Sequence, residues 1–559
     1  MLIFALNPFA PSESRLPSSR RTFLQQASAL SLLYSAQRGL PQASMPNMHM
    51  AGMQTQTPIH SPTPTPPRIA PPMLHTLELA PFVDALPLPE IAKPVLHNGH
   101  RSLTISMQEV HAKVHRDVAP TRMWSYGPSA LAPLIEARSG EPLQIRWVNN
   151  LPAKHFLPID HSLHGCGKDV PEVRAIVHLH GAKAPSKDDG YPEDWFIPGA
   201  SRTCNYPLEQ EATTLWYHDH AMGINRLNTY AGLFGMFLLR DKFEDSLHLP
   251  SGRYEIPLIL YDRNLSTSGQ LLYDTSGDPE HPWIPEFSAD GILINGKIRP
   301  FLEVEPRLYR FRVVNVANSR FFNLSLSNEQ PITQIGSDQG FLSTPADLPR
   351  LILAPAERAD LLIDFSHSAG QTIHLRTGAF DILQLRVAKQ SASTQTSSIP
   401  KTLRPIQRIP ESAATVTRTI TLHEYQDEVE RPMVMLLNRK HWHEPTTEFP
   451  KLNSTEIWEF LNLTEDTHPM HMHLVRFQIL DRRPFDTFDY LAHKKLRFTA
   501  PAVTPEPHEL GWKDTVQCPD ATVTRIIVRF EGYTGKYLYH CHVLEHEAND
   551  MMRPFEVIA

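Results

Sequence analysis

The chain has 559 residues, more than one hydrophobic core normally supports, so several domains are expected. Its formal net charge of -7 provides no basic surface, which argues against nucleic acid as a partner. The sequence has no apolar run of about 18 residues, so no membrane span is predicted. The 51 prolines favour a loop-rich, all-β fold over a helical one.

The N-terminus predicts export. Ser19-Arg20-Arg21 precedes Phe23-Leu24 and a weakly apolar stretch at residues 27–36, an order typical of a twin-arginine signal. We therefore predict a signal peptide at residues 1–44, use of the twin-arginine export machinery, and a periplasmic or extracellular location. The alternative is a disordered tail with a chance arginine pair.

Residues 45–73 have the composition of a linker. A Met-rich cluster at residues 45–53, which includes His49, precedes a stiff Pro-Thr stretch. Thioethers suit Cu(I), so the cluster is a candidate Cu(I) site. A flexible tether without a ligand is the favoured interpretation.

The four cysteines are too few for a disulfide scaffold. Cys166 and Cys204 both lie in predicted loops near the first histidine cluster, and sequence leaves open whether they pair. Cys518 is predicted to be a buried or partly buried free thiol, and Cys541 belongs to the metal motifs described below.

Three strand-like segments indicate an internal repeat. Residues 143–149, 308–315 and 456–462 are rich in aromatic and β-branched residues, and each ends at Asn before a loop. Their regular spacing predicts three related β domains at residues 74–245, 246–390 and 411–559. A Ser-, Thr- and Pro-rich stretch at residues 391–410 is the predicted linker between the second and the third.

Four His-x-His pairs in the chain are candidate metal ligands. Residues i and i+2 share one face of a strand, so each pair presents two imidazoles to one place. Eight imidazoles suit a cluster of three metal ions better than one ion. The second predicted domain has no such pair, so we expect the cluster between the first and the third. The pairs are His178 and His180, His218 and His220, His471 and His473, and His540 and His542.

A second metal site follows from strand parity. Cys541, between His540 and His542, points to the opposite face, and His468 is likewise out of phase with His471. With His546 and Met551, they supply a thiolate, two imidazoles and a thioether, the ligands of a blue (type 1) copper.

Two observations limit this prediction. A zinc site is disfavoured because its tetrahedral Cys/His sites use four ligands. The counterpart run at residues 215–220 carries Asp219 in place of the cysteine, so the first domain is predicted to lack a blue copper. One further pair, His441-Trp442-His443, lies outside these motifs and is predicted to be ordinary polar residues.

The motifs resemble the multicopper oxidases, especially the bacterial spore-coat laccase and bilirubin-oxidase-like branch, from about residue 75 to the end. Asp189-Gly190-Tyr191-Pro192-Glu193 and residues 335–338, 353–358 and 551–554 belong to the same resemblance. It implies three cupredoxin-like Greek-key β-barrel domains and four copper ions. The implied ligands are His468, Cys541, His546 and Met551 for type 1, His178 and His471 for type 2, and His180, His218, His220, His473, His540 and His542 for the type 3 pair.

The resemblance implies one-electron oxidation of phenols or aromatic amines coupled to four-electron reduction of O2 to water. It points to Asp189 and Glu547 as proton donors, although Glu547 could instead orient a ligand imidazole. A Cu(I) metallo-oxidase and a bilirubin or phenoxazinone-type oxidase are the alternatives. Only Met433 and Met435 lie between Gln390 and His468, so no Met-rich insert favours Cu(I) there.

Two other classes fit less well. A copper-storage or electron-carrier protein predicts an incomplete ligand set, and none of the ligands is missing. A copper nitrite reductase needs fewer histidines and only two copper types.

Overall fold

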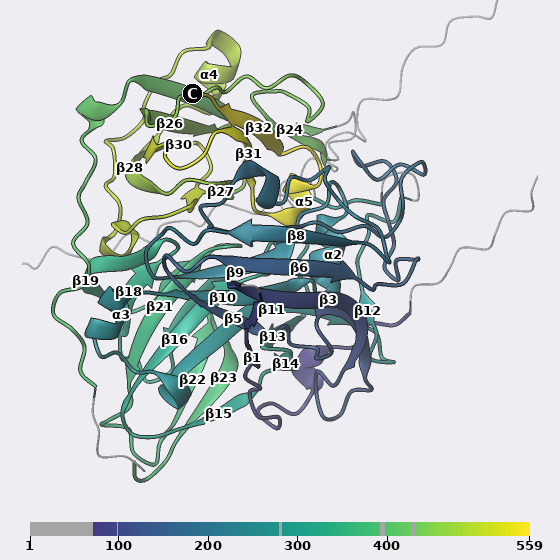
Figure 1. Cartoon of the computed structure of the whole chain (residues 1–559), viewed down its shortest axis with the longest axis vertical. Helices are drawn as coiled ribbons and strands as arrows, with labels where there is room; N and C mark the ends of the chain where they lie inside the picture. The colour runs from purple at the N-terminus through teal and green to yellow at the C-terminus, as the bar shows by residue number, and fades with distance from the viewer. Residues whose placement is uncertain (1–70, 98, 279–281, 392–396, 427–431) are drawn as a thin grey trace, which may run out of the picture. The chain divides into compact units, whose positions relative to one another are not determined.

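The computed structural model describes residues 71–97, 99–278, 282–391, 397–426 and 432–559 (Figure 1). The predicted signal peptide and the Met-rich cluster lie outside these ranges. Strands dominate the described residues, as predicted, and every sheet is contained within one of the three predicted domains. None of the described helices is long and apolar enough to cross a membrane.

The first domain contains two sheets. Their strand orders are β1-β5-β10-β9-β7 and β2-β3-β6-β8, with β4 added to β3. The strands are β1 (Ile91–Ala92), β2 (Val95–His97), β3 (His100–Ala112), β4 (Thr121–Tyr126), β5 (Leu134–Arg138), β6 (Leu143–Asn149), β7 (Val177–His180), β8 (Ser201–Tyr206), β9 (Thr213–Asp219) and β10 (Phe234–Arg240). The helices are η2 (Thr76–Glu78), η3 (Ser186–Asp188), α2 (Asn225–Ala231) and α3 (Lys242–Ser246).

The second domain repeats the two-sheet plan with orders β14-β13-β11-β16-β21-β18-β19, to which β12 is added, and β15-β23-β22-β17-β20. The elements are η4 (Gly252–Tyr254), β11 (Glu255–Leu265), β12 (Leu271–Leu272), β13 (Gly291–Ile294), β14 (Lys297–Ile298), β15 (Phe301–Val304), β16 (Leu308–Asn315), β17 (Phe322–Leu326), β18 (Ile332–Ser337), β19 (Gly340–Leu348), β20 (Leu351–Leu353), β21 (Arg358–Asp364), β22 (Thr372–Thr377) and β23 (Phe380–Val387).

The third domain has sheets of order β25-β24-β26-β30-β28 and β29-β27-β31-β32. The elements are η5 (Glu411–Ala413), β24 (Val416–Gln426), β25 (Pro432–Leu437), β26 (Thr455–Asn462), β27 (His468–Met472), β28 (Phe477–Pro484), α4 (Thr487–His493), η6 (Pro507–Glu509), β29 (Thr515–Cys518), β30 (Thr522–Arg529), β31 (Gly535–Cys541), α5 (Leu544–Glu547) and β32 (Met552–Val557).

The predicted repeat strands are equivalent in the structure. Strands β6, β16 and β26 each pair in parallel with the preceding long strand and antiparallel with a later one. Each ends at a buried asparagine whose Oδ1 accepts from the backbone N–H two residues later, at 3.0–3.1 Å. The side-chain amide of each donates to a carbonyl from another segment. Asn149, Asn315 and Asn462 therefore close the same turn three times.

The first residues of the predicted first domain lie along the second. Leu86 N donates to Phe301 O at 2.7 Å, and Thr76 N donates to Asp290 Oδ2 at 2.6 Å. These hydrogen bonds attach the segment that precedes β1 to the second domain.

Candidate metal centre

The four His-x-His pairs lie at the ends of strands from the first and third domains. β7 pairs antiparallel with β9 so that His178 lies opposite His218, and β27 pairs with β31 so that His471 lies opposite His540. β7 and β9 are buried on both faces, whereas β6 alternates. One face of β7 and β9 packs into the domain core and the other faces the histidine cluster.

All eight predicted cluster histidines meet. Ring centroids of His178 and His473 are 3.8 Å apart, those of His180 and His471 are 3.7 Å apart, and those of His220 and His540 are 5.1 Å apart. Each of these contacts joins the first domain to the third. The eight rings are buried, and several subsets offer three ligand atoms within 4.8 Å of one another.

Tautomers follow from the hydrogen bonds, because a carbonyl oxygen only accepts. Four rings donate through Nδ1 to a backbone carbonyl 2.6–3.0 Å away: those of His178, His218, His471 and His540. Their Nε2 atoms therefore carry lone pairs. For the first three, Nε2 is buried without a hydrogen-bond partner among the described residues. Such orphaned acceptors are costly unless a cation occupies the centre.

The contact between His473 and His540 also indicates a metal site. His540 Nδ1 donates to Cys541 O, and His473 Nδ1 lies 2.7 Å from Asp189 Oδ2. The two Nε2 atoms then face each other at 3.2 Å. When Asp189 is ionised and accepts from His473 Nδ1, both Nε2 atoms carry lone pairs; these repel each other unless a cation binds between them, so these residues fit a metal.

Burial favours the neutral form of several of the cluster imidazoles. It lowers the pKa of His218 and of His220 to about 3, with neighbouring charged groups adding smaller effects, and it lowers the pKa of His178 and His473 well below the usual value. Neutral imidazole is the form that binds a metal ion.

The predicted mononuclear site is also assembled. Cys541 Sγ lies 3.5 Å from His468 Nδ1 and 3.7 Å from His546 Nδ1, and the two nitrogens are 3.2 Å apart. All three residues are buried and form a separate three-ligand group. Thr464 Oγ1 lies 2.6 Å from His468 Nε2, which orients the ring.

Met551 is buried next to this group, and its backbone contacts two of the three residues. Cys541 N donates to Met551 O at 3.0 Å, and Met551 N donates to His546 O at 2.9 Å. Burial raises the pKa of Cys541, so metal binding has to displace the thiol proton.

Both predicted proton donors lie beside the histidine cluster. Asp189 follows η3, contacts His473, and has its pKa raised well above the usual value by burial. Glu547 in α5 accepts from Asn225 Nδ2 at 2.6 Å and lies 3.2 Å from His540 Nδ1. Burial opposes ionisation of Glu547, but its histidine neighbours lower its pKa overall. Of the two carboxyl groups, Asp189 is the one whose neutral form burial favours.

Comparisons with known proteins agree with this site. Residues 170–244 and 412–559 match two multicopper oxidase family models. The laccase of Bacillus subtilis is 44% identical across 86% of this chain and 99% of its own. The laccase of Haloferax volcanii is 36% identical across 96% of this chain and 91% of its own.

The chain belongs to the multicopper oxidase family. The structure of the McoA multicopper oxidase from Aquifex aeolicus, 29% identical, has a TM-score of 0.71 over 85% of this chain and 99% of that one. A multi-copper oxidase from Pediococcus acidilactici, 26% identical, also has a TM-score of 0.71, over 86% of this chain and 94% of that one. The predicted family and cupredoxin-like fold are confirmed. This multicopper oxidase is a copper-binding oxidoreductase that uses O2.

The middle domain of the multicopper oxidase has no His-x-His pair, yet one of its residues contacts the site. Arg358, in β21, forms an ion pair with Asp514, whose Oδ1 lies 3.2 Å from His180 Nε2 and whose carbonyl accepts from His471 Nδ1. Burial opposes ionisation of Asp514, but Arg358 holds its pKa well below the usual value. Asp514 was not predicted. Residues 353–358 belong to the family resemblance, and that motif was the available signal for Arg358.

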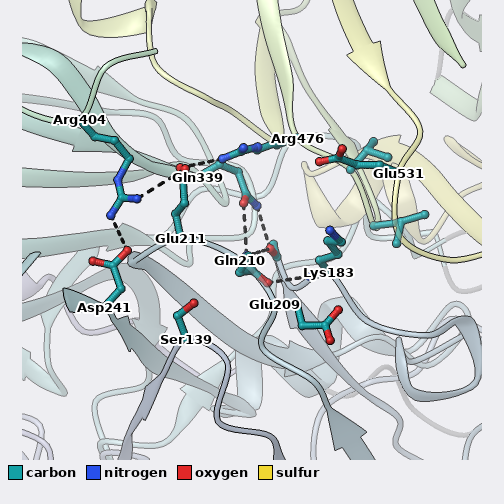
Figure 2. Close-up of a pocket in the computed structure, with 13 residues that line it drawn as sticks. Ser139, Lys183, Glu209, Gln210, Glu211, Asp241, Gln339, Arg404, Arg476 and Glu531 are labelled. Atoms are coloured by element: carbon teal, nitrogen blue, oxygen red, sulfur yellow. Dashed lines mark hydrogen bonds and ion pairs between the residues drawn. The ribbon is translucent and has the colours of Figure 1, made fainter. Parts of the chain in front are cut away.

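A polar cavity of about 370 Å³ adjoins the cluster at Gly181 and Leu474, the residues directly after His180 and His473. Figure 2 shows Gln210 and Gln339 on its wall, with Arg404 and Arg476 both reaching Glu211. Gln339 Nε2 donates to Gly181 O at 2.8 Å and to Asp514 Oδ2 at 2.6 Å. Gln339 therefore links the wall of this cavity to Asp514, the carboxylate beside His180.

The sequence left open whether Cys166 and Cys204 form a disulfide, and in the structure they do not. Cys166, Cys204, Cys518 and Cys541 are all free and buried. Cys518 lies opposite His468 in the β27–β29 register, within the core of the third domain.

Proposed function

We propose that this multicopper oxidase couples one-electron oxidation of a phenol or aromatic amine to four-electron reduction of O2 to water. One observation carries the proposal: Cys541 faces His468 and His546, while both its neighbours in the chain face the eight-histidine cluster. We assign a type 1 copper to His468, Cys541, His546 and Met551. Three further coppers would be held by the eight histidines, divided into type 2 and type 3 ligands as the family pattern implies.

Bound copper would supply one-electron redox chemistry and the place where O2 is reduced. The chain supplies the connection, because Cys541 shares its two peptide bonds with His540 and His542. The His540 Nδ1 hydrogen bond to Cys541 O, at 3.0 Å, adds a second link between ring and backbone. The two sites are thereby joined, yet the oxidised organic donor stays apart from the oxygen chemistry.

Protons reach the cluster from carboxyl groups in this proposal. Asp189 stores a proton beside His473 Nδ1, where burial favours its neutral form. Glu547 is held by Asn225 and contacts both His540 and His220. It either relays protons or orients these two rings.

The copper content and the reaction are tested together. Copper-loaded protein is expected to contain four coppers per chain, to be intensely blue, and to consume one O2 for every four electrons taken from a phenol such as 2,6-dimethoxyphenol. A colourless loaded protein, or a product with two electrons per O2, would contradict the assignment.

Cu(I) oxidation is a second candidate, favoured by a specific contact. Glu286 Oε1 lies 3.5 Å from His546 Nε2, the ring edge that faces away from Cys541, and Glu286 is about half exposed. Asp466 lies near, and its pKa is raised to about 6 by burial and then by Glu286. If the donor passes its electron to His546, carboxylates beside that ring attract cations more than neutral phenols.

Two variants separate the donors. In Glu286→Gln, kcat/KM for Cu(I) falls several-fold if cations enter here, while the value for a neutral phenol or bilirubin stays within about twofold. Deletion of residues 45–72 tests whether the Met-rich cluster contributes to Cu(I) turnover. If Cu(I) oxidation dominates in the intact chain and phenols are inert, the second candidate replaces the first.

Export is part of the proposal. Arg20 and Arg21 support passage through the twin-arginine route, which carries folded proteins. Changing both arginines to lysine is expected to leave the protein in the cytoplasmic fraction. Unchanged export of the double variant would remove the assignment.

A further inference from the structure

The third domain carries an apolar surface that the copper sites do not use. Phe488, in α4, is 77% exposed, the highest value of any large apolar side chain in the described part of the chain. Leu491 is 46% exposed and Val503 is 58% exposed. Residues three apart share one face of a helix, so Phe488 and Leu491 point to the same side. Grouped apolar side chains on a surface mark binding sites, whereas single ones are ordinary.

Helix α4 stands at the tip of a projection that follows β28. Arg482 and Val503 exchange backbone hydrogen bonds of 2.9 and 2.7 Å, and Asp486 N donates to Arg497 O at 2.9 Å. All residues from 491 to 504 are exposed, and Figure 1 shows α4 at the outer edge of the third domain. The projection is therefore an ordered, protruding element and not a groove.

The base of the projection is anchored in the domain. Phe485 is buried with Leu461 and Val523, and Tyr490 packs against this group. The rings of Phe485 and Tyr490 meet edge to face, with centroids 6.0 Å apart. Tyr490 thus uses the inner face of α4 for packing, which leaves the outer face, with Phe488, to solvent.

Cations surround the exposed apolar side chains. Residues 483–503 contain four Lys or Arg and two Asp, a net charge of +2, although the whole chain has -7. Arg497 pairs with both aspartates of the segment. Among the described residues, Arg483, Lys494 and Lys495 form no ion pair, so their charges remain available to an anionic partner.

We propose that this projection binds the surface of an anionic lipid membrane. Phe488 and Leu491 enter the boundary of the acyl chains, while Lys494 and Lys495 contact the phosphate headgroups, as in other interfacial elements. The local cations offset the repulsion between a chain of net charge -7 and a negative membrane. The attachment is peripheral and needs no spanning segment.

The shape of the projection favours lipid over a protein partner. A stable protein interface needs about 800 Å² of matched surface on each side. A helix of 7 residues on a protruding tip offers little such surface, whereas lipids rearrange around a convex element.

Vesicle flotation of the copper-loaded full chain tests the proposal. Binding to phosphatidylglycerol vesicles is expected to be about tenfold stronger than to phosphatidylcholine vesicles, and salt should weaken it because it screens the lysines. Phe488→Ser combined with Leu491→Ser should weaken binding about tenfold, whereas Phe488→Leu keeps the apolar area and should retain it. Lys494→Gln with Lys495→Gln should weaken binding to phosphatidylglycerol and leave the weaker binding to phosphatidylcholine unchanged.

Matched variants serve as controls. Phe380→Ser removes a 53% exposed apolar side chain of the second domain and should leave vesicle binding unchanged. Lys451→Gln with Lys536→Gln removes two exposed lysines elsewhere in the third domain and should have the same outcome. Phe23→Ser, in the predicted signal peptide, should also have no effect. The phenol oxidation rate of each variant checks that it is folded.

Four results would overturn the proposal. They are equal binding to both lipids, undiminished binding of the Phe488/Leu491 double variant, loss of binding in Phe23→Ser alone, and a dimer in sedimentation velocity that dissociates in the double variant. The last would mean that a second copy of the chain covers the patch. The result does not depend on which donor the enzyme oxidises.

Discussion

The ends of strands β9 and β31 carry the same pattern with a different central residue. His218-Asp219-His220 and His540-Cys541-His542 both direct their histidines into the shared cluster. Asp219 instead accepts from Ile176 N and Ala221 N at 3.1 Å and from Asn228 Nδ2 at 2.8 Å. Cys541 lies against two imidazoles.

The surroundings of the central residue differ as much as the residue itself. When His178 is aligned with His471, Ala175 occupies the position of His468. When His220 is aligned with His542, Ile224 occupies the position of His546. Ala175 and Ile224 are both fully buried. The cluster needs only the outer two residues of each strand end. The central position is therefore free to become a structural hydrogen-bond acceptor in one domain and a metal ligand in the other.

Replacing Cys541 should have the largest effect. Cys541→Ser removes the thiolate, so the blue absorption and oxidase activity are expected to fall below detection while copper remains partly bound in the cluster. Absorbance near the Cu–thiolate band and copper analysis check this. The matched control is Cys518→Ser, another buried thiol of the same sheet, which should stay blue. A blue Cys541→Ser protein would remove the assignment.

Asp189→Asn should lower kcat by about a hundredfold, a typical contribution of a positioned proton donor. Anaerobic reduction of the blue band by the donor should keep its rate, because Asp189 lies at the cluster and not beside Cys541. Stopped-flow reduction and O2 uptake separate the two steps. Asp188→Asn, a neighbouring buried carboxylate, is the control. Equal losses in both steps would argue against a role in proton supply.

The Asp219→Cys variant tests whether a cysteine at the central position is sufficient for a blue copper site. We expect no new absorption band, because Ala175 and Ile224 offer no ligands. We also expect a loss of roughly 3 kcal/mol in the free energy of unfolding, since three buried donors lose their acceptor. Urea titration and visible spectra provide the measurements. A blue variant would mean that the surrounding residues matter less than the central one.

The interior of the first domain should also make the fold sensitive to acid. Burial lowers the pKa of His155, which contacts Trp124, to about 3, while the unfolded chain has the ordinary value near 6.5. Below that value the unfolded state binds a proton that the folded state does not, so stability falls as pH drops toward 3. Between pH 6.5 and 5 the loss is about 2 kcal/mol.

His155→Gln should remove that part of the pH dependence. Urea unfolding of copper-free protein at the two pH values, compared with the parent, measures it. An unchanged slope in His155→Gln would show that another group titrates.

Strand parity predicted that the histidines of each His-x-His pair share a face and that His468 and Cys541 point away from the cluster. Parity depends only on backbone geometry, so local sequence encodes it. The repeat strands were predictable for the same reason, down to their terminal asparagines. By contrast, Asp514 and Arg358 are 156 residues apart and belong to different domains. No local pattern links them, because their pairing depends on how the domains pack.

The ring contact between His164 and His443 illustrates the same limit. His441-Trp442-His443 looked ordinary in sequence because its partner, His164, lies in a distant loop. Pairing of residues 74–90 with the second domain was also not visible, because short irregular segments carry little pattern.

The contact between His220 and His540 spans 320 residues of sequence. A ribosome makes the chain from the N-terminus, so the cluster lacks half of its eight histidines until β27 and β31 have emerged. A chain that stops before residue 468 contains the four cluster histidines of the first domain and none of those from the third. The full ligand set of the cluster therefore exists only once nearly the whole chain has been made.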